Sequence, residues 1–319
     1  MSLQIGNLEL KGKVILAPMA GVTSFSYRKF MNKFHPAIAY TEMISDCGLI
    51  YGNKKTIEML QTDGMDRPLG IQLFGGKKET LLKAIDVLDD LKVEYDVLDI
   101  NLACPVNKVV KSNGGSTWLK DLDELYDMMK AICERSTKPV SAKIRLGYND
   151  VNVNETVKVL EKAGVKFIMI HARTRKDLYK GKPRFEELAK VRDLIKIPFG
   201  VSGDIYTVED ALNALKTTRA DAILVARGGI GNPLLISNIN HALKGEPLEE
   251  TTLEKQIKFF NEFKELLKEE KGEKIATSIL KGLAPKFFLM FKDEYKELRK
   301  QLVMAQNYED FDNIIKSIN

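Results

Sequence analysis

The stretch LGIQLFGGKKETLLKAIDVLDDLKVEYDVLDIN, residues 69–101, contains one complete strand–helix–strand unit. Its two ends, LGIQLFG and YDVLDIN, are short runs of mainly apolar residues. Between them, the apolar residues of ETLLKAIDVLDDL (79–91) recur every three or four positions, as they do on one face of a helix. Nearly continuous apolar strands that alternate with amphipathic helices indicate a parallel sheet covered by helices.

The same pattern repeats along most of the chain. Helical spacing returns in ELYDMMKAICERS (124–136) and NETVKVLEKAG (154–164). Eight such units within about 240 residues fit a closed (β/α)₈ barrel better than an open, doubly wound sheet. The predicted strands are VILAPM (14–19), AIAYTEM (37–43), LGIQLFG (69–75), YDVLDIN (95–101), VSAKIRLG (140–147), FIMIHAR (167–173), FGVSGDI (199–205) and AILVARG (222–228).

The character of the sequence changes after about residue 245. GEPLEE (245–250) is typical of a linker, and the remainder is rich in Lys, Glu, Leu and Phe with helical periodicity. We therefore predict an α/β chain of two domains: a (β/α)₈ TIM barrel over residues 1–244 and a small C-terminal helical domain over residues 245–319. The predicted C-terminal helices span residues 253–272, 274–291 and 308–318.

Composition limits the possible functions. Among 319 residues, 49 Lys and Arg against 44 Asp and Glu give a net charge of +5, which is compatible with a nucleic-acid or phosphate partner without establishing one. Basic residues concentrate in 171–184, with six against one acid, and in 274–292, with four lysines and no acid. Three scattered cysteines suit neither a disulfide framework nor a metal site. Without a signal peptide or a long apolar run, we expect a soluble, cytoplasmic protein that does not bind membranes.

Polar residues follow the predicted strands where barrel enzymes bind their ligands, at the C-terminal ends. A purely structural barrel has no need of ionisable groups at all of these ends. The loops APMAG (17–21), SGD (202–204) and ARGG (226–229) follow three of the strands. The individual candidates within or after the other strands are Gln72, Asn101, Cys104, Lys143, Arg145, His171, Arg173 and Arg175.

The last two loops suit a phosphate group. Barrels commonly bind phosphate in the loops after strands seven and eight. Gly203, Gly228 and Gly229 allow the backbone to approach a ligand closely, and Arg227 supplies a positive charge. The alternative is that these glycines form ordinary turns.

Lys143 and His171 each allow two interpretations. Lysine is rarely buried without a partner, so Lys143 either completes an ion pair or points toward an electron-rich ring such as a flavin. Strand alternation places Arg145 on the same face, which favours the functional interpretation. His171 is either a hydrogen-bonded core residue or a site residue, and the basic segment around it favours the site.

Cys104 allows three interpretations. A free cysteine packs well as a small apolar residue, which is the interpretation that suits Cys47 and Cys133. Cys104 differs because it follows a strand end and is flanked by Asn101 and Lys108. A nearby lysine could lower its pKa for nucleophilic attack, or the neutral thiol could donate a proton to a carbon atom. The residues alone do not choose between these roles.

The ordered motifs resemble those of the tRNA-dihydrouridine synthase family over about residues 5–236. The block DIN-x-x-CP-x-x-K-V and the block H-x-RTR-x-x-x-Y-x-G are highly specific. The segments that carry the resemblance are APMAGVTSFSYR, TEM, IQLFG, DINLACPVNKVVKSNGG, KIRLG, HARTRKDLYKG, SGDI and ARGGIGNP.

The resemblance implies an FMN-dependent barrel that uses NADPH to reduce the C5–C6 double bond of selected uridines in tRNA. It implies that a flavin hydride goes to C6 and that Cys104 is the catalytic residue that protonates C5. It places Pro18, Met19, Ala20, Gln72 and Lys143 against the flavin ring. It places His171, Ser202, Gly203, Asp204, Ala226, Arg227 and Gly228 along the FMN ribityl chain and phosphate.

For the RNA, the resemblance implies that Asn101 holds the uracil and that Arg145, Arg173 and Arg175 contact phosphates or the target base. The basic segments 171–184 and 274–292 are then expected to hold tRNA phosphates. The chain departs from the usual family pattern where Ser202 replaces Asn and where Ala226 and Ala172 replace Gly. These changes affect the fine position of FMN more than its binding.

Two other functions compete with this one. An FMN barrel oxidoreductase that acts on a free pyrimidine, similar to dihydroorotate dehydrogenase, would share the barrel and the phosphate loops. It would not require the basic segment 171–184 or a basic helical tail. A non-catalytic tRNA-binding protein would not need Cys104, Lys143 or Gln72, and all three are present. The sequence indicates no obligate protein partner.

Overall fold

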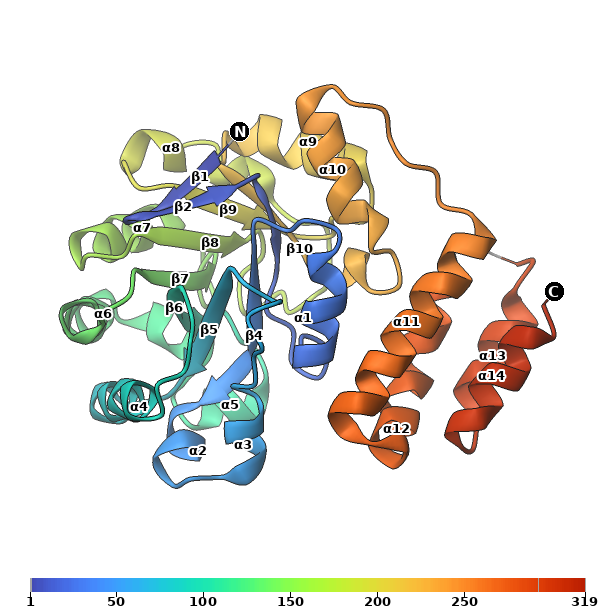
Figure 1. The fold of residues 1–319 in the computed structure, drawn as a ribbon. Coiled ribbons are helices and arrows are strands. Elements are labelled where there is room, and N and C mark those ends of the chain that lie inside the picture. Colours follow the sequence, from blue (N-terminus) through green and yellow to red (C-terminus); the bar gives the residue numbers. More distant parts are fainter. Residues whose placement is uncertain (1, 292, 319) are drawn as a thin grey trace.

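The computed structural model describes residues 2–291 and 293–318, and it confirms the barrel (Figure 1). Eight parallel strands close in the order β10-β3-β4-β5-β6-β7-β8-β9. All eight lie within or close to the predicted runs. They are β3 (Val14–Leu16), β4 (Ile38–Ser45), β5 (Leu69–Phe74), β6 (Val97–Leu102), β7 (Val140–Arg145), β8 (Phe167–His171), β9 (Phe199–Ser202) and β10 (Ala222–Val225).

The strand register brings polar residues of neighbouring strands to the same level. Gln72 pairs with Asp99, and Asp99 pairs with Ser141 on the next strand. Four residues beyond Ser141 on β7, Arg145 pairs with His171, which pairs in turn with Ser202. Paired residues of parallel strands project to the same face, so each level assembles polar side chains inside the barrel.

A hairpin that the sequence analysis did not predict precedes the barrel. Strands β1 (Ser2–Ile5) and β2 (Leu8–Lys11) pair antiparallel through a two-residue Gly6-Asn7 turn. Leu3, Ile5 and Leu10 are buried in one cluster with apolar residues of the barrel strands. The hairpin therefore supplies part of the apolar filling of the barrel. Its turn, with Gly6 at φ 59°, is a recognisable hairpin signal between two short apolar runs.

The helices cover the outer surface of the barrel with one apolar face each. In α4 (Lys78–Asp90), the buried residues are Leu81, Ala84, Ile85 and Leu88, the spacing expected of an amphipathic helix. The predicted helices over 79–91, 124–136 and 154–164 are confirmed as α4, α6 and α7. Of these, α6 spans Leu122–Arg135 and α7 spans Val153–Lys162. The other helices up to residue 244 are α1 (Phe25–Asn32), α2 (Asp46–Ile50), α3 (Lys54–Glu58), α5 (Asn107–Lys111), α8 (Val191–Leu194), α9 (Val208–Thr218) and α10 (Leu234–Lys244), with short 3₁₀ turns η1 (Gly115–Lys120), η2 (Phe185–Leu188) and η3 (Arg227–Gly229).

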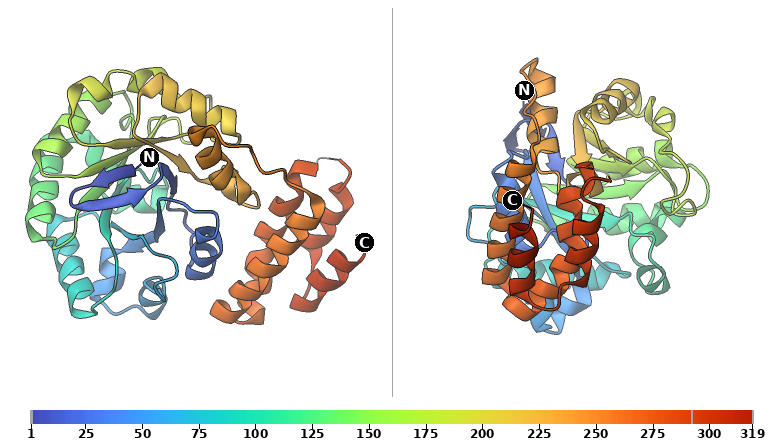
Figure 2. Two further views of the ribbon diagram at one scale, coloured as in Figure 1. Left: turned by 45° about the horizontal axis from the view of Figure 1, so that its top comes forward. Right: turned by 90° about the vertical axis from the view of Figure 1, so that its right-hand side faces the viewer.

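The C-terminal segment is helical, as predicted, and lies to one side of the barrel (Figure 2). The predicted helix over 274–291 is correct for its first part only, because a 3₁₀ segment follows from Ala284. Pro285 lacks the N–H that a continuing α-helix requires. A further helix, α13, lies in a stretch for which no helix was specified. The elements are α11 (Leu253–Lys271), α12 (Glu273–Leu283), η4 (Ala284–Phe291), α13 (Lys296–Met304) and α14 (Tyr308–Lys316).

An aromatic cluster joins these helices to the barrel. Phe263 of α11 packs edge-on against Tyr27 of α1, with ring centroids 5.5 Å apart, and lies 5.7 Å from the ring of Phe30. Glu270 of α11 accepts a hydrogen bond from the Ser26 backbone N–H at 2.8 Å, in the first turn of α1. These three contacts fix α11 against α1. Over residues 2–291 and 293–318, no helix is long and apolar enough to cross a membrane.

Candidate active site

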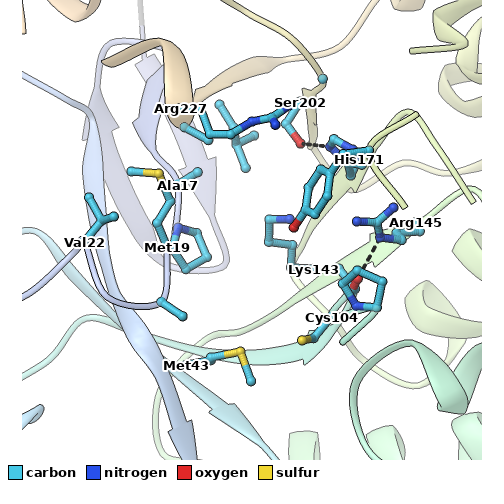
Figure 3. Close-up of a pocket in the computed structure, with 18 of the residues that line it drawn as sticks. Ala17, Met19, Val22, Met43, Cys104, Lys143, Arg145, His171, Ser202 and Arg227 are labelled. Atoms are coloured by element: carbon cyan, nitrogen blue, oxygen red, sulfur yellow. Dashed lines mark hydrogen bonds between the residues drawn. The ribbon is translucent and has the colours of Figure 1, made fainter. Parts of the chain in front are cut away.

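A cavity of about 340 Å³ opens at the C-terminal ends of the barrel strands (Figure 3). Its volume lies in the range of roughly 300–1,000 Å³ that is usual for small-molecule sites. All predicted site residues except Arg173 and Arg175 line it. They are Pro18, Met19, Ala20, Gln72, Asn101, Cys104, Lys143, Arg145, His171, Ser202, Gly203, Asp204, Ala226, Arg227 and Gly228.

Cys104 lies at the wall of this cavity, two residues beyond the end of β6. Its backbone N–H donates to Asn101 Oδ1 at 2.9 Å, and its carbonyl accepts from Ser116 Oγ at 2.9 Å. The side chain is 9% exposed, and this burial raises the pKa of the thiol above its ordinary value. A raised pKa keeps the proton on sulfur at neutral pH. Of the two reactive roles left open by the sequence, the environment therefore favours the acid over the thiolate nucleophile.

Lys143 extends from β7 toward the middle of the cavity (Figure 3). Burial, followed by the charge of Arg145, lowers the pKa of its ammonium to about 8. No acceptor in residues 2–291 or 293–318 takes a hydrogen bond from its Nζ. The structural ion pair that the sequence left open is therefore not formed by a direct contact. A half-desolvated cation without a partner suits contact with an electron-rich ligand.

His171 ends β8, which only β7 separates from β6, the strand that precedes Cys104. In Figure 3 its ring lies beside Ser202, on the same side of the cavity as Arg145 and Cys104. Its Nδ1 atom lies 3.2 Å from Ser202 Oγ, whereas its Nε2 atom is buried and has no partner within the described chain. Burial, and after it the nearby cations Lys143 and Arg145, hold the pKa of His171 well below its ordinary value. The imidazole is thus neutral, with one ring nitrogen free for a ligand.

The loops after β9 and β10 meet at close range. A Cβ on Gly228 would lie 1.9 Å from the Ile205 carbonyl oxygen, so only glycine fits there. Arg227 donates to Asp204 at 2.8 Å, and its side chain is 47% exposed. Asp204 has a left-handed backbone conformation with φ 46°. The two loops are held together while the Arg227 guanidinium stays accessible to an anion.

Arg173 and Arg175 lie outside the cavity. Arg173 is 1% exposed, and its guanidinium donates to Asp204 and to the carbonyl oxygens of Lys180 and Gly181. The structure therefore does not support the predicted direct contact between Arg173 and RNA, because the guanidinium is already enclosed by protein acceptors. Arg175 packs 5.1 Å above the ring of Tyr148 and reaches Asn107 Oδ1 at 3.3 Å.

The structure adds two residues that the sequence analysis missed. Asp99 is fully buried on β6, accepts hydrogen bonds from Gln72 and Ser141, and has its pKa raised to about 7 by burial. An acid within an apolar strand, two positions before Asn101, was the available signal. Tyr179 lines the cavity with its ring 5.3 Å from the Arg145 guanidinium carbon and 4.9 Å from that of Arg227. A lone aromatic within the basic segment 171–184 was its signal.

Comparisons with known proteins identify the family of this chain. The family model described as dihydrouridine synthase (Dus) matches residues 15–318. A probable tRNA-dihydrouridine synthase 1 from Synechocystis sp. is 33% identical over 286 residues, which cover 88% of this chain and 80% of that protein. The tRNA-dihydrouridine synthase B of Pseudomonas aeruginosa is 32% identical over 248 residues, covering 77% of this chain and 74% of that protein.

Two solved structures share the fold at low sequence identity. An old yellow enzyme homologue from Zymomonas mobilis is 14% identical, with a TM-score of 0.54 over 80% of this chain and 95% of that one. The 6-hydroxypseudooxynicotine amine oxidase from Pseudomonas geniculata is 13% identical, with a TM-score of 0.58 over 76% of this chain and 49% of that one. Because the family model spans nearly the whole chain and relatives above 30% identity cover most of it, this protein belongs to the dihydrouridine synthase family.

Proposed function

We propose that this protein is a tRNA-dihydrouridine synthase, which reduces the C5–C6 double bond of particular uridines in tRNA with FMN as cofactor and NADPH as reductant. The observation that carries the proposal is the placement of the buried Cys104 thiol, whose pKa burial raises, in one cavity with Lys143 and with His171 Nε2, which has no partner among the described residues. Family membership and the names of the relatives, which are tRNA-dihydrouridine synthases, support tRNA as the substrate.

The residues of the cavity fit FMN. His171 Nε2 is a buried polar atom without a partner among the described residues, and Lys143 is a partly buried cation that lines the same cavity. Gly228 provides the close backbone approach that a phosphate requires, next to the accessible Arg227. We assign Pro18, Met19, Ala20, Gln72 and Lys143 to the flavin ring, and His171, Ser202, Gly203, Asp204, Ala226, Arg227 and Gly228 to the ribityl chain and phosphate.

Cys104 supplies the proton in this proposal. FMN, when bound and reduced by NADPH, supplies the hydride for uracil C6. The Sγ–H of Cys104 gives its proton to C5, so that one hydride and one proton saturate the double bond and the sulfur regains its proton from water. Burial of the thiol keeps this proton in place until the base arrives. Lys143 stabilises negative charge in the cavity, and Asn101 holds the Cys104 backbone in position.

A uridine within tRNA reaches this cavity only after it leaves its stack. The exposed lysines Lys176, Lys180 and Lys182 lie in the segment that also brings Tyr179 to the cavity wall. Lys286 belongs to the C-terminal helices, and its backbone closely approaches Gly231, in the loop after β10. We propose residues 1–244 as the catalytic barrel and residues 245–319 as a tRNA-binding domain, active in the cytoplasm, where tRNA is found. Lys292, the last lysine of the predicted basic stretch 274–292, lies outside the described residues.

Position-resolved nucleoside mass spectrometry of bulk tRNA tests the function directly. Cells that lack the gene are compared with cells complemented by wild type or by Cys104→Ala. We expect the loss of dihydrouridine at defined positions, restored by wild type and not by the variant. Dihydrouridine that is unchanged at every position, together with no reduction of a tRNA transcript by purified protein, FMN and NADPH, would contradict the proposal. Reduction of free orotate or uracil instead would favour the small-molecule oxidoreductase.

A further inference from the structure

A buried chain of hydrogen bonds runs from Asp99 to the backbone of Cys104. Asp99 Oδ2 accepts from Gln72 Nε2 at 2.6 Å, and Gln72 Oε1 accepts from Asn101 Nδ2 at 2.7 Å. Asn101 Oδ1 then accepts from the backbone N–H groups of Ala103 at 3.1 Å and of Cys104 at 2.9 Å. Gln72 and Asn101 line the cavity, whereas Asp99 is fully buried behind it.

This series of hydrogen bonds has a fixed donor-to-acceptor direction, which the groups at its two ends determine. A backbone N–H can only donate, so Asn101 must turn its oxygen toward Cys104 and its NH₂ group toward Gln72. Gln72 must then present its oxygen to Asn101 and its NH₂ group to Asp99. Asp99 Oδ2 can accept in either charge state, because Ser141 Oγ, 2.6 Å from Oδ1, is a partner for a proton on that oxygen. The Gln72 and Asn101 side-chain amides therefore each have only one orientation in which all of these hydrogen bonds form.

We propose that Asp99 is a positioning residue, which fixes the amide orientations of Gln72 and Asn101 and thereby the backbone that carries the Cys104 thiol. The consequence for catalysis rests on the function proposed above, in which that thiol donates the proton. Removal of the acceptor at residue 99 leaves the Gln72 NH₂ group without a partner and free to turn. A turned Gln72 presents NH₂ to Asn101, and a turned Asn101 presents NH₂ to the N–H of Cys104, which cannot accept it.

Three variants separate the loss of the acceptor from the loss of charge. Asp99→Leu keeps the branched shape of the side chain and removes the acceptor. Asp99→Asn removes the charge but keeps an oxygen for Gln72 when its NH₂ group faces Ser141, whose hydroxyl can accept. Ser141→Ala is the matched control, since it removes the other hydrogen bond of Asp99 and leaves the chain toward Cys104 intact. All three are made in the full-length protein, with FMN content measured.

The first readout is the rate of Cys104 alkylation by iodoacetamide, followed by peptide mass spectrometry, with the partly buried Cys133 as internal standard. We expect iodoacetamide to modify Cys104 at least about tenfold faster in Asp99→Leu than in wild type. The rate at Cys133 should stay within about twofold of its wild-type value. Asp99→Asn and Ser141→Ala should stay within about threefold of wild type. The second readout is turnover on tRNA, which should fall about tenfold or more in Asp99→Leu alone, with KM for tRNA little changed.

Several outcomes would overturn the proposal. The first is a folded Asp99→Leu protein in which Cys104 is alkylated at the wild-type rate. The second is an equal increase of this rate in Asp99→Leu and Asp99→Asn, which would show that the charge of Asp99 and not its acceptor oxygen matters. If Asp99→Leu does not fold, the double variant Asp99→Asn with Ser141→Ala replaces it. Iodoacetamide should modify Cys104 in this double variant more than threefold faster than in either single variant. Equal rates would refute the proposed positioning role of Asp99. The alkylation readout needs no tRNA, so a protein that makes no dihydrouridine but shows this pattern would refute the proposed function and leave the positioning role standing.

Discussion

His171 Nδ1 lies 3.2 Å from Ser202 Oγ, and this contact leaves the buried Nε2 of His171 as the free nitrogen that faces the cavity. The serine hydroxyl can donate to Nδ1, and the neutral imidazole then carries its proton on Nε2. When Ser202 donates in this contact, the pair presents a buried N–H donor to the cavity. Ser202 stands where the resembling family usually has asparagine, and the shorter side chain still provides the hydrogen bond that orients the ring.

His171→Ala should weaken FMN binding by about 10- to 150-fold, because a hydrogen bond to a charged group contributes roughly 1.5–3 kcal/mol. Fluorescence titration of the cofactor-free protein with FMN measures this change. His241→Ala, on α10 outside the cavity, is the control and should bind FMN as wild type does. Equal FMN affinity in His171→Ala and wild type would show that Nε2 does not contact the cofactor.

Cys104→Ala should lower the rate of uridine reduction by about 10²- to 10⁴-fold, the usual contribution of a general acid. Single-turnover assays on tRNA measure the rate, and flavin absorbance verifies that FMN is retained. Cys133→Ala removes a thiol from α6 outside the cavity and should stay within about twofold of wild type.

The pH dependence of the same step follows from the raised pKa of the Cys104 thiol. The reaction requires the protonated thiol, so the Cys104-dependent rate should persist through neutral pH and fall only when the pH exceeds that raised value. A rate that instead increases with pH through the neutral range would indicate a thiolate mechanism. The measurement is the single-turnover rate between pH 6 and about 10.

Lys143→Met should slow uridine reduction and at the same time stabilise the cofactor-free protein. Burial lowers the folded-state pKa of Lys143 to about 8, below its ordinary 10.5, so the unfolded chain binds more protons between these values. The free energy of unfolding of wild type should therefore rise with pH across this window, relative to the variant. At pH 7 we expect Lys143→Met to be more stable by roughly 1–3 kcal/mol. Urea unfolding at pH 7 and pH 10 measures the difference, and a variant less stable than wild type at pH 7 would contradict this reasoning.

Lys180→Gln should weaken tRNA binding and reduce the slope of log affinity against log salt by about 0.7–0.9, the value of one phosphate contact. The Lys180 side chain is exposed in the basic segment near the cavity, so the change is confined to charge. Lys158→Gln, on the outer surface of α7, changes the net charge equally and should leave the slope unaltered. Filter binding across a salt series distinguishes the two variants. Identical slopes would exclude Lys180 from the RNA contact.

Phe263→Ala should destabilise the protein by about 3–5 kcal/mol, because it opens a cavity between α1 and α11. Urea unfolding measures this loss. Leu289→Ala, at a position that is 51% exposed in η4, is the control and should change stability by less than about 0.5 kcal/mol. If the aromatic contact also holds the helical domain for tRNA, Phe263→Ala should raise KM for tRNA more than it lowers the FMN content.

The sequence by itself determined the barrel, because its information is local and periodic. Runs such as 69–75 and 95–101 show a strand length, and the helix 79–91 shows its buried face through residue spacing. Closure of eight such units places their C-terminal ends together, so Cys104 and Lys143 could be assigned to one site before any contact was known. The β1–β2 hairpin was missed, although the Gly6-Asn7 turn between its two short strands was a usable signal.

Only the tertiary structure decided what each polar side chain does within that site. Arg173 carries the same charge as Arg227, yet enclosure by Asp204 and backbone carbonyls makes it structural, whereas Arg227 stays half exposed. Asn101 Oδ1 accepts a hydrogen bond from the backbone N–H of Cys104, and burial raises the pKa of the Cys104 thiol. These properties depend on desolvation and on partners from other strands. Register and burial are set by packing across the whole barrel, and no local stretch of sequence encodes them.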